Sequence, residues 1–118
     1  MVTIEKVAQY ALFSDDIKLS LLVEEFLRNN PDLSHVSQPN TTDPRVLAVA
    51  AGLLELFAMR AGQRAPEWTQ AVGPMPAPFF LRSSAMKWPY LRQRCLEEAP
   101  EPLKKRLLYA TADFLQTV

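Results

Sequence analysis

The sequence predicts an all-α fold, a compact bundle of about five to six helices. Three observations predict it. Apolar residues recur at helical spacing, and one long apolar stretch carries the signals that start and stop a helix. Proline is frequent, with 10 residues, and glycine is scarce, with 3, which suits helices joined by stiff connectors. Because the chain has 118 residues, 48% of them hydrophobic and 22% charged, we expect a single helical domain over residues 1–118.

Residues 3–29 are expected to form a helical hairpin. Their apolar residues follow the i, i+3, i+4, i+7 pattern in both halves. Ser14 is the expected N-cap of the second helix, because acidic residues follow it where a helix dipole is positive. Pro31 ends that helix, since it has no amide hydrogen to donate. Residues 31–43 are polar and without periodicity, and they predict a loop.

The clearest prediction is a central helix over residues 44–61. Asp43 is a natural N-cap, Pro44 fits the first helical position, and Gly62 supplies the left-handed residue that closes a helix. Its charged side chains share one arc of about 140°, at roughly 100° per residue, and they are Arg45, Glu55 and Arg60. Such a helix must be covered on several sides. Small residues near its middle, Gly52 among them, would let another backbone approach closely.

A proline-rich extended strap is expected over residues 74–82. Prolines at alternate positions fix φ and keep their predecessors away from helical angles. A short helix, from Pro66 to about Val72, precedes it. The strap either closes over the central helix, so that truncating Phe80 costs roughly 3 kcal/mol, or presents an aromatic ledge to a partner protein. The candidate partner-binding residues are Trp68, Phe79, Phe80 and Trp88.

The C-terminal part predicts further helices and a basic surface. Pro89 begins a helix through Glu98, a second one follows from Pro100 or Pro102 to about Tyr109, and Thr111 is a possible cap for a last helical turn. If these helices pack side by side, their basic residues form one patch for phosphates or an acidic partner. These residues are Arg92, Arg94, Lys104, Lys105 and Arg106. The same residues also fit an ordinary solvated surface.

Charge is uneven along the chain, although the formal net charge is zero. Residues 1–43 carry three basic and seven acidic side chains, a net of −4, whereas residues 79–118 carry seven basic and four acidic ones, a net of +3. This asymmetry either joins the two ends of the fold, favours head-to-tail association, or has no role. The neutral total argues against strong affinity for nucleic acid or a membrane surface.

The order of several short motifs resembles a group of small uncharacterised bacterial proteins. The motifs are Ala65-Pro66-x-Trp68-Thr69, Pro76-x-Pro78-Phe79-Phe80-Leu81 and Pro100-Glu101-Pro102-Leu103-x-Lys105-Arg106, followed by Tyr109-Ala110. The resemblance covers roughly residues 46–115, and no activity is established for the group. Some members accompany transcriptional regulators or toxin–antitoxin-type operons. The resemblance therefore implies a regulatory interaction protein, and it transfers no functional residue.

The residues that carry most enzyme chemistry are sparse. His35 is the only histidine and lies in the polar loop, far in sequence from Cys95, the only cysteine. No motif joins either to a nucleophile, a base or a set of metal ligands. Three glycines do not form a phosphate-binding loop. We therefore predict no catalytic residues, no cofactor and no metal site.

These observations predict a non-catalytic protein-interaction module, regulatory or antitoxin-like, that binds another protein or self-associates, with a homodimer favoured. The alternative is a nucleic-acid-associated regulator that uses the C-terminal basic patch. A single cysteine and the lack of a sustained apolar run near Met1 favour the cytoplasm, without a membrane partner.

Overall fold

The structure is a computed structural model, and it describes residues 2–13, 16–81 and 88–115. The expected all-α fold is confirmed. The α-helices in these ranges are α1 (Ile4–Phe13), α2 (Asp16–Asn29), α3 (Pro44–Ala61), α4 (Pro89–Glu98) and α5 (Glu101–Lys104). Two short 3₁₀ helices, η1 (Leu33–His35) and η2 (Glu67–Ala71), and two strands, β1 (Phe79–Phe80) and β2 (Leu108–Tyr109), complete the elements. The proposed cap at Ser14 lies outside the described residues.

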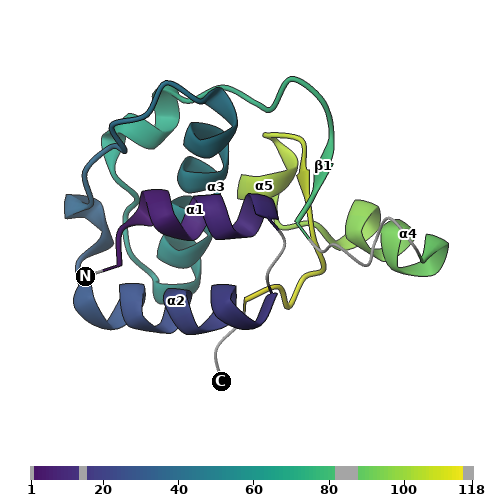
Figure 1. Cartoon of the computed structure of the whole chain (residues 1–118), viewed down its shortest axis with the longest axis horizontal. Helices are drawn as coiled ribbons and strands as arrows, with labels where there is room; N and C mark the ends of the chain where they lie inside the picture. The colour runs from purple at the N-terminus through teal and green to yellow at the C-terminus, as the bar shows by residue number, and fades with distance from the viewer. Residues whose placement is uncertain (1, 14–15, 82–87, 116–118) are drawn as a thin grey trace.

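The helix α3 occupies the centre of the fold, as expected. It contacts α1, α5 and both 3₁₀ helices, and α1 also packs against α2 (Figure 1). Both predicted ends are confirmed. The Asp43 carboxylate accepts a hydrogen bond from the Arg45 amide at 2.9 Å, and Gly62 has a left-handed φ of 67°. Apolar side chains from Val2 to Phe114 pack around α3 in one core cluster.

A close approach of the C-terminal region to α3 depends on Gly52. A Cβ atom at this position would lie 3.1 Å from Leu103 Cδ2 and 3.2 Å from Leu108 Cδ1. Both leucines are fully buried. A glycine near the middle of α3 therefore makes room for the side chains of α5 and β2, as the small residues of this helix predicted.

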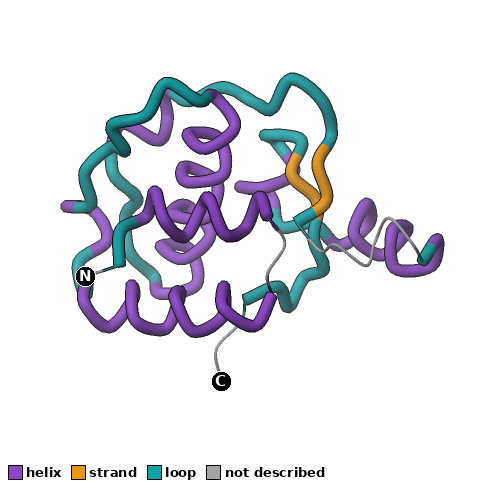
Figure 2. The backbone as a smooth tube through the Cα atoms, viewed as in Figure 1, coloured by secondary structure: helices purple, strands orange, loops and turns teal. Residues whose placement is uncertain are grey.

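The strap runs from η2 to β1 and is held along residues 106–109 (Figure 2). The two strands pair in parallel, and the amides of Met75, Phe79 and Leu81 donate to carbonyl oxygens of that segment at 2.9 Å each. Leu81 is fully buried, whereas Phe80 is half-buried and stacks on Tyr109 with ring centroids 5.6 Å apart. The strap thus closes over the core mainly through Met75 and Leu81 and not through Phe80. Its expected last residue, Arg82, lies outside the described residues.

The expected helix from Pro100 or Pro102 to about Tyr109 is wrong in its second half. The helix α5 ends at Lys104, and Leu107 adopts a left-handed φ of 63°. This turn redirects the chain so that β2 can pair with β1. Hydrogen bonds to a distant segment override the local helical tendency here. Residues 112–115 likewise form a turn after Thr111, and residues 116–118 lie outside the described part.

Within the described ranges, we find no helix with the length and apolar character needed to cross a membrane.

Candidate functional site

The four candidate aromatic residues do not share one surface. Trp68 is half-buried, and its indole Nε1 donates to the Val36 carbonyl oxygen at 2.9 Å. Phe79 is half-buried against the core, and Phe80 stacks on Tyr109. Trp88, in contrast, is 64% exposed immediately before α4. Three of the four therefore serve mainly in packing, and Trp88 alone among them presents most of its surface to solvent.

The five candidate basic residues are also divided. Arg106 is buried, with 3% of its side chain exposed, and it binds Glu55. Lys105 is half-exposed and binds the same carboxylate, with Nζ and Oε1 3.0 Å apart. Arg94 pairs with Glu98 on its own helix at 2.9 Å. The remaining two, Lys104 and Arg92, are exposed on different helices. The structure therefore does not gather all five into one patch.

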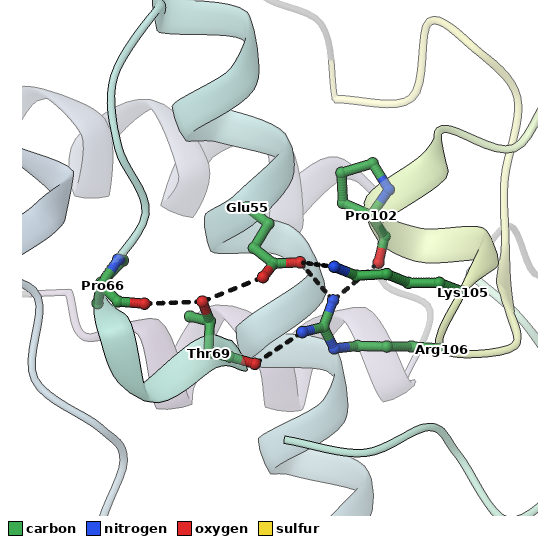
Figure 3. Close-up of polar contacts among 6 residues, drawn as sticks. All are labelled: Glu55, Pro66, Thr69, Pro102, Lys105 and Arg106. Carbon is green, nitrogen blue, oxygen red and sulfur yellow. Dashed lines mark hydrogen bonds and ion pairs between the residues drawn. The ribbon is translucent and has the colours of Figure 1, made fainter. Parts of the chain in front are cut away.

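Glu55 is the centre of a buried polar cluster that joins three elements (Figure 3). It lies on α3 and is 12% exposed. Arg106, which follows α5, donates from Nη1 to Glu55 and, at 3.1 Å, to the Pro102 carbonyl oxygen. Its Nη2 donates to the Thr69 carbonyl oxygen in η2 at 2.7 Å. One guanidinium thus connects α3, η2 and α5.

The Thr69 hydroxyl extends the same cluster. It lies 3.1 Å from Glu55 Oε2 and 2.7 Å from the Pro66 carbonyl oxygen. Because it has a single proton, it donates to one of these acceptors at a time. Burial by itself raises the pKa of Glu55, but the hydrogen bonds from Arg106 and Lys105 outweigh it and hold that pKa below its ordinary value of 4.5. Glu55 is therefore ionised at neutral pH.

The contacts of this cluster account for how α3, η2 and α5 pack together, and they do not indicate a catalytic reaction. Hydrogen bonds commit both oxygens of Glu55 and two nitrogens of Arg106 to neighbouring residues. The sequence interpretation placed Glu55 on a narrow polar arc and missed its pairing with Arg106. A lone carboxylate in the middle of an apolar helix was the available signal, because a buried charge requires a partner.

Leu21 on α2 and Met59 on α3 are exposed, and the other three exposed large apolar side chains of the described residues lie at or on α4. This helix lies apart from the other α-helices, at one end of the molecule (Figure 1). Trp88 is 64% exposed, Tyr90 79% and Leu96 38%, all within nine positions. Isolated exposed apolar residues are common, but two aromatic rings and a leucine on one short helix are typical of a contact surface.

One side of α4 anchors it to the fold. Cys95 is fully buried and Leu91 is half-buried. The ion pair between Arg94 and Glu98 lies beside them, and Glu98 also accepts from the Ala112 amide at 3.3 Å. The pKa of Glu98 is held below its ordinary value by the hydrogen bond from Arg94 and by that amide. These contacts place one side of α4 against the fold, while Trp88 and Tyr90 remain exposed.

A cleft lies at the C-terminal ends of α2 and α3. Its volume is about 450 Å³, within the range of about 300–1,000 Å³ in which proteins bind small ligands. Its lining is largely apolar, with an arginine, and includes Leu27, Leu33, Phe57, Arg60, Ala61 and Leu115. Arg60 Nη2 donates to the Ala112 carbonyl oxygen at 3.1 Å, while its Nη1 is buried without a partner. Burial lowers the pKa of Arg60 more than the nearby Asp113 raises it.

The remaining reactive residues lie apart. His35 is exposed in η1, with Nδ1 3.4 Å from Asp32 Oδ2, whereas Cys95 lies on the buried side of α4. Among the residues that the structure describes, no group of three or more histidine, cysteine, aspartate or glutamate side chains could hold a metal ion.

Comparison with known proteins adds no relative: no family model, no curated protein and no solved structure matches this chain. We therefore infer function from the geometry.

Proposed function

We propose that this chain is a non-catalytic protein-interaction module whose recognition element is α4. The observation that carries the proposal is the exposure of Trp88 and Tyr90 at the start of a helix that lies apart from the other α-helices. Tryptophan and tyrosine are enriched among the residues that dominate binding energy at protein interfaces. An exposed tryptophan loses contact with water when a partner covers it, and this favours association.

The anchoring of α4 supports this role. The burial of Cys95 and the hydrogen bond from the Ala112 amide to Glu98 hold α4 against the fold, so the helix itself does not have to be positioned when a partner binds. Such preorganisation lowers the entropic cost of association. A regulatory or antitoxin-like protein acts by binding and restraining another protein, and a short helix with aromatic anchors is suited to occupying a groove on its target.

The test compares two substitutions on α4. Trp88→Ala removes the main anchor, and Gln93→Ala, at an exposed position of the same helix, is the matched control. Binding is measured by light scattering after size exclusion and by capture of proteins from the native host. We expect Trp88→Ala to weaken association by about 2 kcal/mol or more, roughly thirtyfold in Kd. The proposal is wrong if the two variants show the same oligomeric state and capture the same proteins.

The alternative role in nucleic-acid binding has less support. Arg106 is buried in the Glu55 cluster, Lys105 binds the same carboxylate, and Arg94 is paired with Glu98. Gel shifts at two salt concentrations test it, because phosphate contacts weaken steeply as salt rises. Salt-sensitive binding that is lost with Lys104→Ala would favour this alternative over the one above.

A further inference from the structure

We propose that the cleft at the C-terminal ends of α2 and α3 binds a small molecule with an apolar body and one carboxylate, and that Arg60 binds this carboxylate. The site is separate from the recognition surface proposed on α4, so this inference does not depend on the proposed function. The ligand class follows from the apolar walls of the cleft, its positive charge and its preformed shape.

The walls of the cleft are suited to an apolar body. Side chains from α2, η1, α3 and the turn near the C-terminus surround a volume of about 450 Å³, and they include Leu27, Leu33, Phe57 and Leu115. Leu27 and Leu115 are half-buried, so a bound apolar group would remove more of their surface from water. A cleft of this size accepts a phenylalkyl group or a medium-length acyl chain.

Arg60 carries the only charge of the described cleft lining. Its Nη2 donates to an uncharged acceptor, the Ala112 carbonyl oxygen, at 3.1 Å, and its Nη1 is buried without a hydrogen-bond partner. Asp113 raises the pKa of Arg60, but burial lowers that pKa by more, so the guanidinium is not fully compensated. A carboxylate would supply the missing acceptor. Because the Arg60 side chain is only half-buried, we expect its guanidinium to turn Nη1 toward the ligand.

A carboxylate matches this lining better than a phosphate or a neutral polar group does. A phosphate monoester carries about −1.5 to −2 charges at neutral pH, and the described lining offers one guanidinium to balance them. A neutral group gains less, because hydrogen bonds that involve ionised groups are roughly twice as strong as neutral ones. The expected ligand is therefore an apolar monocarboxylate.

Hydrogen bonds hold the cleft in shape without a ligand. The Gln63 side chain accepts from the Leu33 amide and donates to the Pro31 carbonyl oxygen, both at 2.9 Å. The Asn30 side chain donates to the Phe26 carbonyl oxygen at 2.8 Å. The loop after α2 is thereby fixed against the end of α3. A preformed cleft requires little rearrangement to accept a ligand.

The experiment measures binding of two acids and of their neutral amides to the full chain. The acids are octanoate and phenylpropionate, and octanamide and phenylpropanamide are the matched controls. Nuclear magnetic resonance of the backbone amides follows each titration. We expect at least one acid to bind with a Kd of about 1 mM or tighter, and about tenfold more tightly than its amide. The largest shifts should occur at residues that line the cleft, such as Leu33 and Gln63.

Two pairs of variants identify the site. Arg60→Gln removes the charge of the cleft, and Arg64→Gln, at an exposed arginine outside the lining, is its control. Ala61→Trp fills the cleft from an exposed position of the lining, and Ala71→Trp, at an exposed alanine outside it, is its control. We expect Arg60→Gln to weaken acid binding about tenfold or more without changing amide binding, which also shows that this variant is folded. Ala61→Trp should abolish binding of both kinds of probe.

Other results overturn the inference. If neither acid binds at about 10 mM, the cleft does not bind this class of ligand. If acids and amides bind wild type equally well, Arg60 does not select the ligand. If Arg64→Gln weakens acid binding as much as Arg60→Gln does, or if the shifts lie outside the cleft, the acids bind through general surface charge. The Trp88→Ala test of α4 has no bearing on these results, so the two proposals fail separately.

Discussion

Arginine–glutamate pairs occur both at the end of α5 and on α4, but the first is buried and the second is partly exposed. Where the chain leaves α5, Arg106 is 3% exposed and pairs with Glu55, which lies 51 residues earlier. On α4, Arg94 pairs with Glu98 one helical turn away, and both side chains remain partly exposed. Aromatic residues show the same difference in burial. Phe79, which pairs with Leu108 after α5, packs on the core, whereas Trp88 next to α4 is exposed to solvent.

This comparison shows that residue type does not decide the role of a side chain here. A buried charge with a distant partner determines how elements pack, because its pairing must be retained when water is excluded. An exposed pair on one helix contributes little, because water and salt screen it. The junction of α3 and α5 therefore holds the fold, and α4 is left to present a surface.

The largest effect is expected at the junction. Glu55→Ala leaves the Arg106 guanidinium buried without its carboxylate, and breaking such a pair costs about 3–5 kcal/mol. Urea unfolding followed by circular dichroism measures the change, with Glu97→Ala on the exposed side of α4 as the control. A loss similar to that of the control would show that Arg106 does not depend on Glu55.

Replacement of the whole pair sharpens this prediction. A double variant, Glu55→Leu with Arg106→Met, removes both charges and fills similar space. Because a buried pair gains little over apolar packing, we expect it to recover most of the stability that Glu55→Ala loses. A double variant as unstable as the single one would mean that the bonds to Thr69 and Pro102 carry the stabilisation instead.

Within the strap, Leu81 and Phe80 are expected to differ. Leu81→Ala opens a cavity at a fully buried position and should cost about 2–5 kcal/mol. Phe80 is half-buried, and the ring pair it forms with Tyr109 contributes about 0.5–1.5 kcal/mol. Phe80→Ala should therefore have the smaller effect in thermal unfolding. The reverse order would identify Phe80, and not Leu81, as the anchor of the strap.

The stability of the junction should also depend on pH. Because the pKa of Glu55 lies below 4.5 in the folded protein, its ionised form stabilises the fold above that pH. The stabilisation is lost as pH falls through the folded pKa. We expect wild type to be more stable than Glu55→Gln at pH 7, with the difference shrinking in acid. Urea midpoints at a series of pH values measure it, and a constant difference would contradict this role of Glu55.

The smallest effect is expected on α4. Glu98→Gln weakens an exposed pair with Arg94 and retains the shape of the side chain. We expect the melting temperature to change less than for any variant above, because solvent already screens this pair. A change as large as that of Glu55→Ala would place α4 among the elements that hold the core and would weaken the case for it as a recognition helix.

Elements whose signals are local could be predicted from the amino-acid sequence. Asp43, Pro44 and Gly62 marked both ends of α3, and the helix found at Pro89–Glu98 has the predicted bounds. These features depend on residues within one turn of each other, through capping bonds, a fixed proline φ and a left-handed glycine. The apolar breadth of α3 likewise indicated its central position, since such a surface must be covered.

Which side chains meet and which remain exposed depends on long-range packing and became visible in the structure. The pairing of Glu55 with Arg106 spans 51 residues, and the strand at Leu108–Tyr109 exists because the strap lies beside it. The exposure of Trp88 and the burial of Leu81 likewise could not be predicted from the positions of these residues in the sequence. Such outcomes depend on how complete elements pack, because the free energy of burying a charge or a ring is set by its neighbours in space.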